Sequence, residues 1–257
     1  MNNGWRLIWI CVLFTACGRV TAQPQQRFEN LRVSDQLVVN HFSSDPERYE
    51  SHLVITDVEG AGPVVNVLLY SDDGTLVDQD FFFLSTFGKV NYNPAERLGK
   101  RVFSGSLRII SDGGKIAAQY WQFYRDPDLA PLNTALPASE GKGGRALLCQ
   151  HFVSDPKVDA SLYISNARGD SAVTVAITFY LDRGKQLSKD RYTIPPNGKI
   201  AVHPYEANEG IIKTGVAYVE VRGFGAITGE YWQKAPAENY QVSLPLEIIP
   251  VRKKDWW

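Results

Sequence analysis

The chain has 257 residues and a formal net charge of −1, which excludes the strongly basic surface through which many proteins bind nucleic acid. Aromatic residues make up 12% of the sequence and only one Met is present. This composition favours strands, because rings and β-branched side chains suit pleated surfaces. We therefore expect a strand-rich protein without a nucleic-acid partner.

Residues 1–22 are predicted to be an export signal. Arg6 precedes an uncharged apolar run, LIWICVLFTA, that is too short to span a bilayer and suits a secretory signal. Cleavage after Ala22 fits the small-residue rule of signal peptidase. Alternatively, LFTAC, which ends at Cys17, resembles the lipobox of bacterial lipoproteins and implies membrane anchoring through a lipidated Cys17. We expect an exported protein that is periplasmic, anchored to the outer membrane as a lipoprotein, or secreted.

The rest of the chain is dominated by an internal repeat. LVVNHF ending at Phe42 matches LLCQHF ending at Phe152, so that His41 and His151 lie 110 residues apart. The same offset aligns Ser51 with Ser161, and after one inserted residue the motif YWQ recurs. A repeat of this length is a whole domain, because solenoid units are only about 20–50 residues long.

These matches predict five segments after the signal. A polar tether (residues 23–34) leads into repeat 1 (35–137), and a small, glycine-rich linker (138–144) joins it to repeat 2 (145–249). The tail, 250–257, ends in two tryptophans after two lysines. That composition suits a membrane-interface anchor, a partner-docking tail, or an end packed on repeat 2.

Within each repeat the hydrophobic pattern has a period of two. Val64–Tyr70 and Val173–Tyr180 read as strands, and the turn residues Asp72–Gly74 and Asp182–Gly184 follow them. About six or seven short strands in a hundred residues are typical of an antiparallel β-sandwich. The predicted fold class is therefore all-β, with two tandem duplicated antiparallel β-sandwich domains.

A family resemblance supports the same fold. SLYISN, VTVAITFY, YTIPPNGKI and AITGEYWQ, all in repeat 2, follow the order of the strands of the sensory rhodopsin transducer family, which each repeat resembles. The resemblance implies a β-sandwich. The family's role on the cytoplasmic face of a rhodopsin is not carried over, because this chain begins with a predicted export signal.

The repeated histidines are predicted to be structural. Strand alternation puts His41 on the face of Leu37 and Val39, four residues before Asp45, which precedes a proline. Such an aspartate bonds to the backbone of its own turn. One His and one Asp per repeat cannot close a zinc site, so the alternative is a metal site shared between the repeats. Cys149 reads as a small buried hydrophobe.

The sequence carries no recognisable catalytic motif. A G-x-S-x-G elbow does not occur, and Ser104-Gly105-Ser106 lies at the start of a strand. The carboxylates Asp72 and Asp73 fall on a hairpin turn and lack the spaced oxygens of a calcium loop. We expect a protein that is not an enzyme and that has no cofactor and no metal.

The repeated tryptophan is the best candidate for ligand binding. Alternation puts Trp121 beside Gln119, and Trp232 beside Glu230, on the sheet face opposite the predicted core. An exposed indole flanked by hydrogen-bonding groups suits a sugar ring or a peptide. The alternative is that the tryptophans face inward, lie under a loop, or pack against the other repeat.

These observations lead to one functional hypothesis and one rival. The first is an exported, non-enzymatic binding or adhesion protein of the bacterial envelope, whose glycan or protein ligand contacts the tryptophan-bearing face. Duplication would then add avidity. The rival is a structural or accessory subunit of an envelope complex that binds through exposed strand edges.

Overall fold

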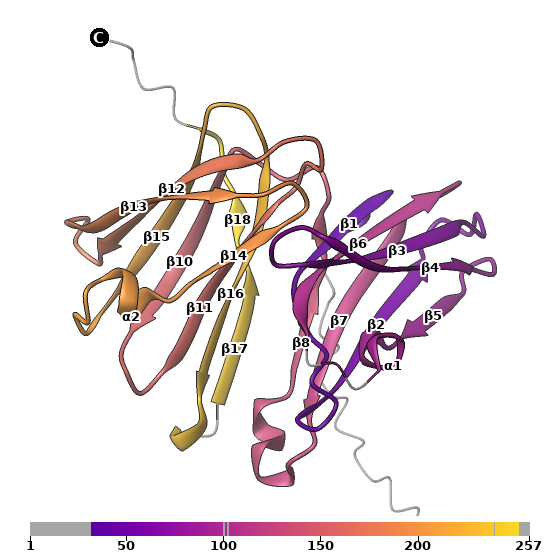
Figure 1. Cartoon of the computed structure of the whole chain (residues 1–257), viewed down its shortest axis with the longest axis horizontal. Coiled ribbons are helices and arrows are strands. Elements are labelled where there is room, and N and C mark those ends of the chain that lie inside the picture. The colour runs from indigo at the N-terminus through magenta and orange to yellow at the C-terminus, as the bar shows by residue number, and fades with distance from the viewer. Residues whose placement is uncertain (1–31, 100, 102, 239, 252–257) are drawn as a thin grey trace, which may run out of the picture. The chain divides into compact units, whose positions relative to one another are not determined.

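A computed structural model describes residues 32–251, except 100, 102 and 239 (Figure 1). The described residues belong to one compact unit and are almost entirely β. None of the helices within them is long and apolar enough to cross a membrane. The export signal, Cys17 and the two final tryptophans lie outside the described residues.

Repeat 1 is built from two antiparallel sheets, with strand orders β4-β3-β6-β1-β9 and β5-β2-β7-β8. Its elements in chain order are β1 (Gln36–Ser43), β2 (Tyr49–Asp57), β3 (Val64–Ser71), β4 (Leu76–Phe83), β5 (Lys89–Tyr92), α1 (Pro94–Leu98), β6 (Ser104–Asp112), β7 (Ile116–Tyr124), the 3-10 helix η1 (Pro127–Leu132), β8 (Thr134–Pro137) and β9 (Ser139–Glu140).

Repeat 2 has the same plan, with strand orders β13-β12-β15-β10-β18 and β14-β11-β16-β17. Its elements are β10 (Ala146–Ser154), β11 (Asp159–Asn166), β12 (Val173–Leu181), β13 (Gln186–Ile194), β14 (Lys199–Val202), α2 (Pro204–Ala207), β15 (Lys213–Arg222), β16 (Ile227–Ala235), the 3-10 helix η2 (Pro236–Glu238), β17 (Tyr240–Pro245) and β18 (Glu247–Ile248).

Strand register supports the duplication in detail. The β1–β6 ladder shifts between Val39 and Phe42, and the β10–β15 ladder shifts between Cys149 and Phe152. A second shift occurs at equivalent places in the β3–β4 and β12–β13 ladders. Bulges of this kind change the direction in which side chains point and are characteristic of a particular fold, so their recurrence at equivalent places supports duplication. The predicted pair of antiparallel β-sandwiches is therefore confirmed.

Each repeat has its own apolar core, produced by alternation along its strands. In β2, for example, Leu53 and Ile55 are buried, while Val54 between them is only half-buried. Phe42 and Phe152 are both fully buried at the centres of their cores. Cys149 is buried, as predicted.

One match of the sequence alignment is wrong, and one segment between the repeats has more structure than its composition suggests. Ser51 pairs with Gln122, whereas Ser161 pairs with Trp232, so the partner of Ser161 in the repeat is His52. The β1–β2 connection therefore differs in length by one residue between the repeats. The segment predicted as a linker also has structure, because β9 within it pairs with β1.

Candidate functional site

A cluster of buried polar side chains lies where the two repeats meet, and we call it the junction. Repeat 1 contributes the outward faces of β1 and β6 and the β3–β4 turn, and repeat 2 contributes β11, β14 and β16. The β3–β4 turn of repeat 1 lies close to the start of β14 in repeat 2, since the Lys199 backbone N–H donates to the Asp72 carbonyl at 2.9 Å. Arg108 also donates to the Asn166 carbonyl at 2.6 Å.

His41 reaches the junction because of the irregularity in β1. Simple alternation predicted that His41 shares the face of Leu37 and Val39, and this is wrong. The register shift puts Phe42 in the core with Leu37 and turns Asn40 and His41 outward against repeat 2. The predicted Asx turn is confirmed, since Asp45 Oδ1 accepts the Glu47 N–H at 3.1 Å.

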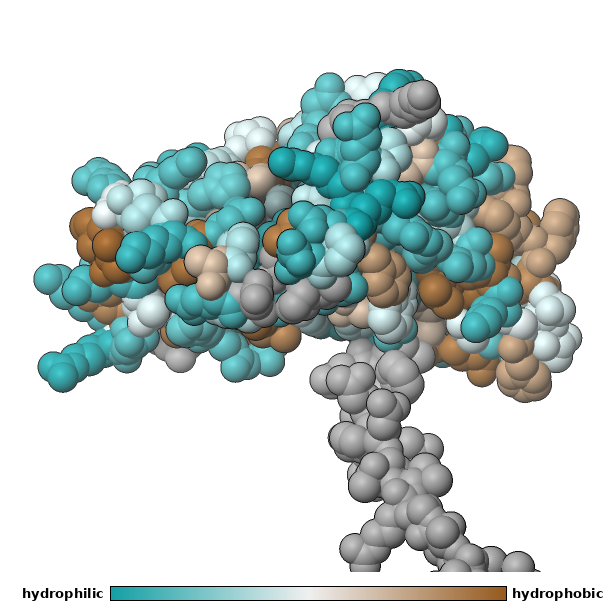
Figure 2. Space-filling model, turned by 90° about the horizontal axis from the view of Figure 1, so that it is seen from below, coloured by the Kyte–Doolittle hydropathy of each residue, from teal (hydrophilic) through white to brown (hydrophobic). Residues whose placement is uncertain are grey.

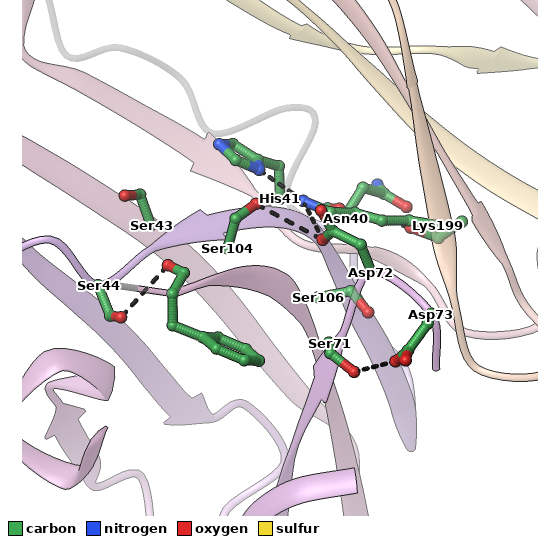
Figure 3. Close-up of polar contacts among 12 residues, drawn as sticks. Asn40, His41, Ser43, Ser44, Ser71, Asp72, Asp73, Ser104, Ser106 and Lys199 are labelled. Carbon is green, nitrogen blue, oxygen red and sulfur yellow. Dashed lines mark hydrogen bonds and ion pairs between the residues drawn. The ribbon is translucent and has the colours of Figure 1, made fainter. Parts of the chain in front are cut away.

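Lys199 of repeat 2 is the centre of the junction (Figure 3). Its Nζ lies 2.6 Å from His41 Nδ1, 3.3 Å from Asp72 Oδ1 and 3.3 Å from Ser104 Oγ. The Lys199 side chain is 1% exposed, and burial lowers its pKa to about 8 although Asp72 and Glu230 act in the opposite direction. Burial, then the charge of Lys199, holds the pKa of His41 well below its usual range.

Glu230 is a second buried ionisable group at the junction. Its Oε1 accepts the indole N–H of Trp232 at 2.8 Å. Burial raises the pKa of the Glu230 carboxyl to about 7, against the Trp232 hydrogen bond and the Lys199 charge, which lower it. Asn40 lies beside it and accepts a hydrogen bond from Thr228 at 2.6 Å.

The expectation that both tryptophans are exposed is wrong for Trp232. Trp232 is 1% exposed and packs against the core of repeat 1. Its ring meets the His41 ring edge-on at 5.3 Å between centroids, and His41 in turn stacks on Tyr163 at 4.0 Å. The physical reason is that repeat 1 covers this sheet face, so Trp232 and Glu230 cannot contact a ligand from solvent.

Trp121 and Gln119 lie in a different setting, on the outward face of β7. Both are half-buried. Trp121 stacks on Phe123 with centroids 5.9 Å apart, and His52 meets Phe123 edge-on. Of the four predicted ligand-binding residues, this pair alone retains a partly exposed surface.

An apolar patch on repeat 1 was not anticipated from the sequence. Val64 lies opposite Phe83, and Asn66 lies opposite both Phe81 and Ile110. Four exposed apolar residues therefore share the outward face of this sheet: Val64 (36%), Phe81 (61%), Phe83 (84%) and Ile110 (37%). Figure 2 shows apolar residues gathered at the right-hand end, where Figure 1 places β4. We call this surface the β4 patch.

Repeat 2 carries polar residues at every position of the β4 patch. Register equates the four apolar residues with Thr174, Arg191, Thr193 and Glu220. A comparison of the two copies, position by position, would have revealed the patch from the sequence. Because the fold is the same in both repeats, the fold does not require these apolar side chains.

Phe87 adds a strained aromatic residue to repeat 1. It has φ 53° and is 69% exposed. Its counterpart Asn197 has φ 58°, a conformation that Asn tolerates and that is unfavourable for a bulky residue. Phe87 packs over Gly60, which has no Cβ to block it.

The histidines are not brought together in a metal site. His41 is buried at the junction, whereas His151 is exposed on repeat 2. Within the described residues, no group of three or more His, Cys, Asp or Glu side chains is placed to hold a metal ion.

Comparisons with known proteins do not identify the chain. No protein-family model matches it, and no curated protein matches it in sequence. A putative β-galactosidase from Bacteroides fragilis is 12% identical with a TM-score of 0.16, and the match covers 80% of this chain and 32% of that one. A mutant β-glucuronidase 2 of Bacteroides uniformis is 10% identical with a TM-score of 0.18, covering 82% and 26%. The chain thus spans a third or less of these proteins, and neither likeness bears on its function. The sensory rhodopsin transducer resemblance stays a prediction.

Proposed function

We propose that this chain is a non-enzymatic binding protein of the bacterial cell envelope that holds an extended apolar segment of a protein partner on the β4 patch. The observation that supports this most strongly is the contrast between the repeats at this surface. Large exposed apolar side chains grouped on one face typically mark an interaction site. Phe81 and Phe83 are not part of the core, and repeat 2 adopts the same fold with Arg191 and Thr193 at these positions.

The strand edge favours an extended partner. β4 is the outermost strand of its sheet, so one side of its backbone is available for pairing. Its counterpart β13 carries Lys189 and Arg191, and charged residues on an edge strand discourage pairing with another chain. β4 has Gln79 and Phe81 at these two positions, and its own charges, Asp78 and Asp80, are paired with Arg97. Its unpaired edge and exposed phenylalanines suit β-strand addition.

The conformation of Phe87 also supports a binding role. A bulky residue with positive φ costs stability, so its presence in an exposed position calls for an explanation outside folding. Phe87 follows β4 in the chain, and its exposed ring adds to the aromatic surface of repeat 1. A partner that covered it would remove its apolar surface from water.

Short synthetic peptides that alternate Phe, Ile or Val with Thr test this function. We expect saturable binding by fluorescence anisotropy and slower hydrogen exchange at the β4 amides when peptide is bound. The variant Val64→Thr/Phe81→Arg/Phe83→Thr, which installs the residues of repeat 2, should lose binding. The control Arg191→Ala/Thr193→Ala should keep it. Equal binding by the triple variant, or none by any peptide, contradicts the proposal.

A glycan is a second candidate ligand, at Trp121. The partly exposed Trp121 ring, with Gln119 on the same face, offers an apolar plane beside a hydrogen-bonding amide. Titration with peptidoglycan fragments, monitored by tryptophan fluorescence, should give a saturable signal that Trp121→Ala abolishes. A signal that survives this substitution rules out Trp121 as the glycan site.

A further inference from the structure

The junction joins two different surfaces, which makes it a heterologous contact. Repeat 1 contributes what we call the acceptor face, which includes Asn40, His41, Asp72 and Ser104. Repeat 2 contributes the donor face, which includes Lys199, Glu230 and Trp232. Because the repeats share one fold, each also carries a copy of the face that it does not use here.

The unused acceptor face on repeat 2 is exposed. Its residues Gln150, His151, Asp182 and Thr214 are the counterparts of the four acceptor residues of repeat 1, and all are exposed. Asn40 is fully buried and His41 is 9% exposed. The used and unused acceptor faces contain equivalent hydrogen bonds. Thr214 donates to Asp182 at 3.3 Å, as Ser104 donates to Asp72 at 3.5 Å.

Backbone shape is also kept on this face. Gly74 allows the close approach at the junction, since a Cβ there would lie 1.9 Å from the Pro196 carbonyl. Gly184, its counterpart, has a similar positive φ and nothing within 4 Å of its Cβ position. The unused acceptor face therefore has the same open turn with nothing packed into it.

The unused donor face lies on repeat 1. Lys89 is the counterpart of Lys199, since each pairs with the equivalent position of β2 or β11, and it is exposed. Gln119 and Trp121 correspond to Glu230 and Trp232 and are half-buried. Trp121 thus repeats the indole that packs on the other repeat at the junction.

The two unused faces match each other chemically. Lys89 would meet Asp182 as Lys199 meets Asp72, and this pair of opposite charges lies on exposed residues of both faces. Gln119 would meet Gln150, just as Glu230 lies beside Asn40 at the junction. Two amide side chains can donate hydrogen bonds to each other.

We propose that molecules of this chain associate head to tail, with the donor face of repeat 1 in one molecule packing on the acceptor face of repeat 2 in the next. The contact repeats the junction between molecules. A heterologous contact leaves one free face at each end, so it continues into a filament unless the rotation closes a ring. The β4 patch lies on neither of these two faces, so binding of a protein partner there and self-association are separate properties, whereas a glycan on Trp121 would compete with this contact.

Charge reversal tests the proposal on the chain purified from the envelope. We expect the sedimentation coefficient of the wild-type protein to rise with concentration beyond that of a dimer. Lys89→Asp and Asp182→Lys should each stay monomeric, because each places like charges across the contact. A mixture of the two should assemble into alternating chains, because the donor face of each variant is opposite in charge to the acceptor face of the other. The double variant should assemble again. Asp112→Lys, an exposed reversal on neither face, should behave as wild type.

Several outcomes overturn the proposal. They are a wild-type protein that is monomeric at all concentrations, single variants that assemble as wild type does, and single variants that are monomeric but do not combine when mixed. A second measurement avoids charge reversal. Oxidation of Lys89→Cys/Asp182→Cys should give a ladder of disulfide-linked multimers that neither single cysteine variant gives, and the absence of a ladder contradicts the contact.

Discussion

Lys199 Nζ of repeat 2 lies 2.6 Å from His41 Nδ1 of repeat 1. Since an ammonium group can only donate, this contact requires a His41 ring that is neutral and protonated at Nε2. Burial and the Lys199 charge, which lower the pKa of His41, favour that same state. One side chain of repeat 2 thus fixes the protonation of a side chain in repeat 1, and the two repeats are coupled through charge as well as packing.

Alanine substitutions at the two equivalent lysines should show how much of the free energy of unfolding comes from the junction, because only Lys199 lies in it. Lys199→Ala removes the buried ammonium group that contacts His41 and Asp72 and whose charge favours ionised Glu230, and we expect the free energy of unfolding to fall by about 3 kcal/mol. Lys89→Ala removes an exposed side chain and should change it by no more than about 0.5 kcal/mol. Urea denaturation of dilute protein measures both, and equal effects would show that Lys199 contributes nothing specific.

The ionisation of Glu230 should make stability depend on pH. Its pKa is raised from 4.5 to about 7 in the folded protein, so between these values the folded state keeps a proton that the unfolded chain releases. Stability from this group is therefore full below about pH 4.5 and is lost as pH rises through about 7.

Glu230→Gln should remove this dependence. We expect the variant to match the wild type near pH 4.5 and to exceed it by at most about 3 kcal/mol at pH 8, because each pKa unit corresponds to 1.36 kcal/mol. The titration of His41 is present in both proteins and cancels in the difference. Urea denaturation from pH 4.5 to 8 measures this, with exposed Glu59→Gln as the control. A constant difference between variant and wild type would show that Glu230 stays ionised throughout.

The two tryptophans should differ in their contribution to stability. Trp232→Ala opens a cavity at the junction and should cost about 3–5 kcal/mol. Trp121→Ala removes a half-buried ring and should cost about 1 kcal/mol. Thermal unfolding followed by circular dichroism compares the two variants. Equal losses would mean that Trp121 is as deeply packed as Trp232.

The contrast between these tryptophans also shows where sequence reasoning stops. Alternation and turn residues predict the sandwiches, because strand and hairpin preferences are local. The same YWQ motif occurs in both repeats, so no local pattern tells which copy the other repeat covers. His41 was misplaced for a related reason, since the shift after Val39 inserts a residue that alternation cannot anticipate. The β4 patch could have been found, because Phe81 and Phe83 stand where the second copy has Arg191 and Thr193.

The two equivalent turn glycines provide a test of the junction that leaves charge unchanged. Gly74 and Gly184 have φ of 85° and 77°, so alanine at either position pays a similar backbone strain of about 1–2 kcal/mol. A Cβ at Gly74 also meets the Pro196 carbonyl at 1.9 Å, whereas one at Gly184 meets nothing within 4 Å. We expect Gly74→Ala to cost about 2 kcal/mol more than Gly184→Ala, because the turns of the two repeats must separate. Urea denaturation gives the difference, and amide exchange at Lys199, whose N–H bonds to Asp72, should be faster in Gly74→Ala alone. Equal stability and unchanged exchange would mean that the repeats do not approach each other at this turn.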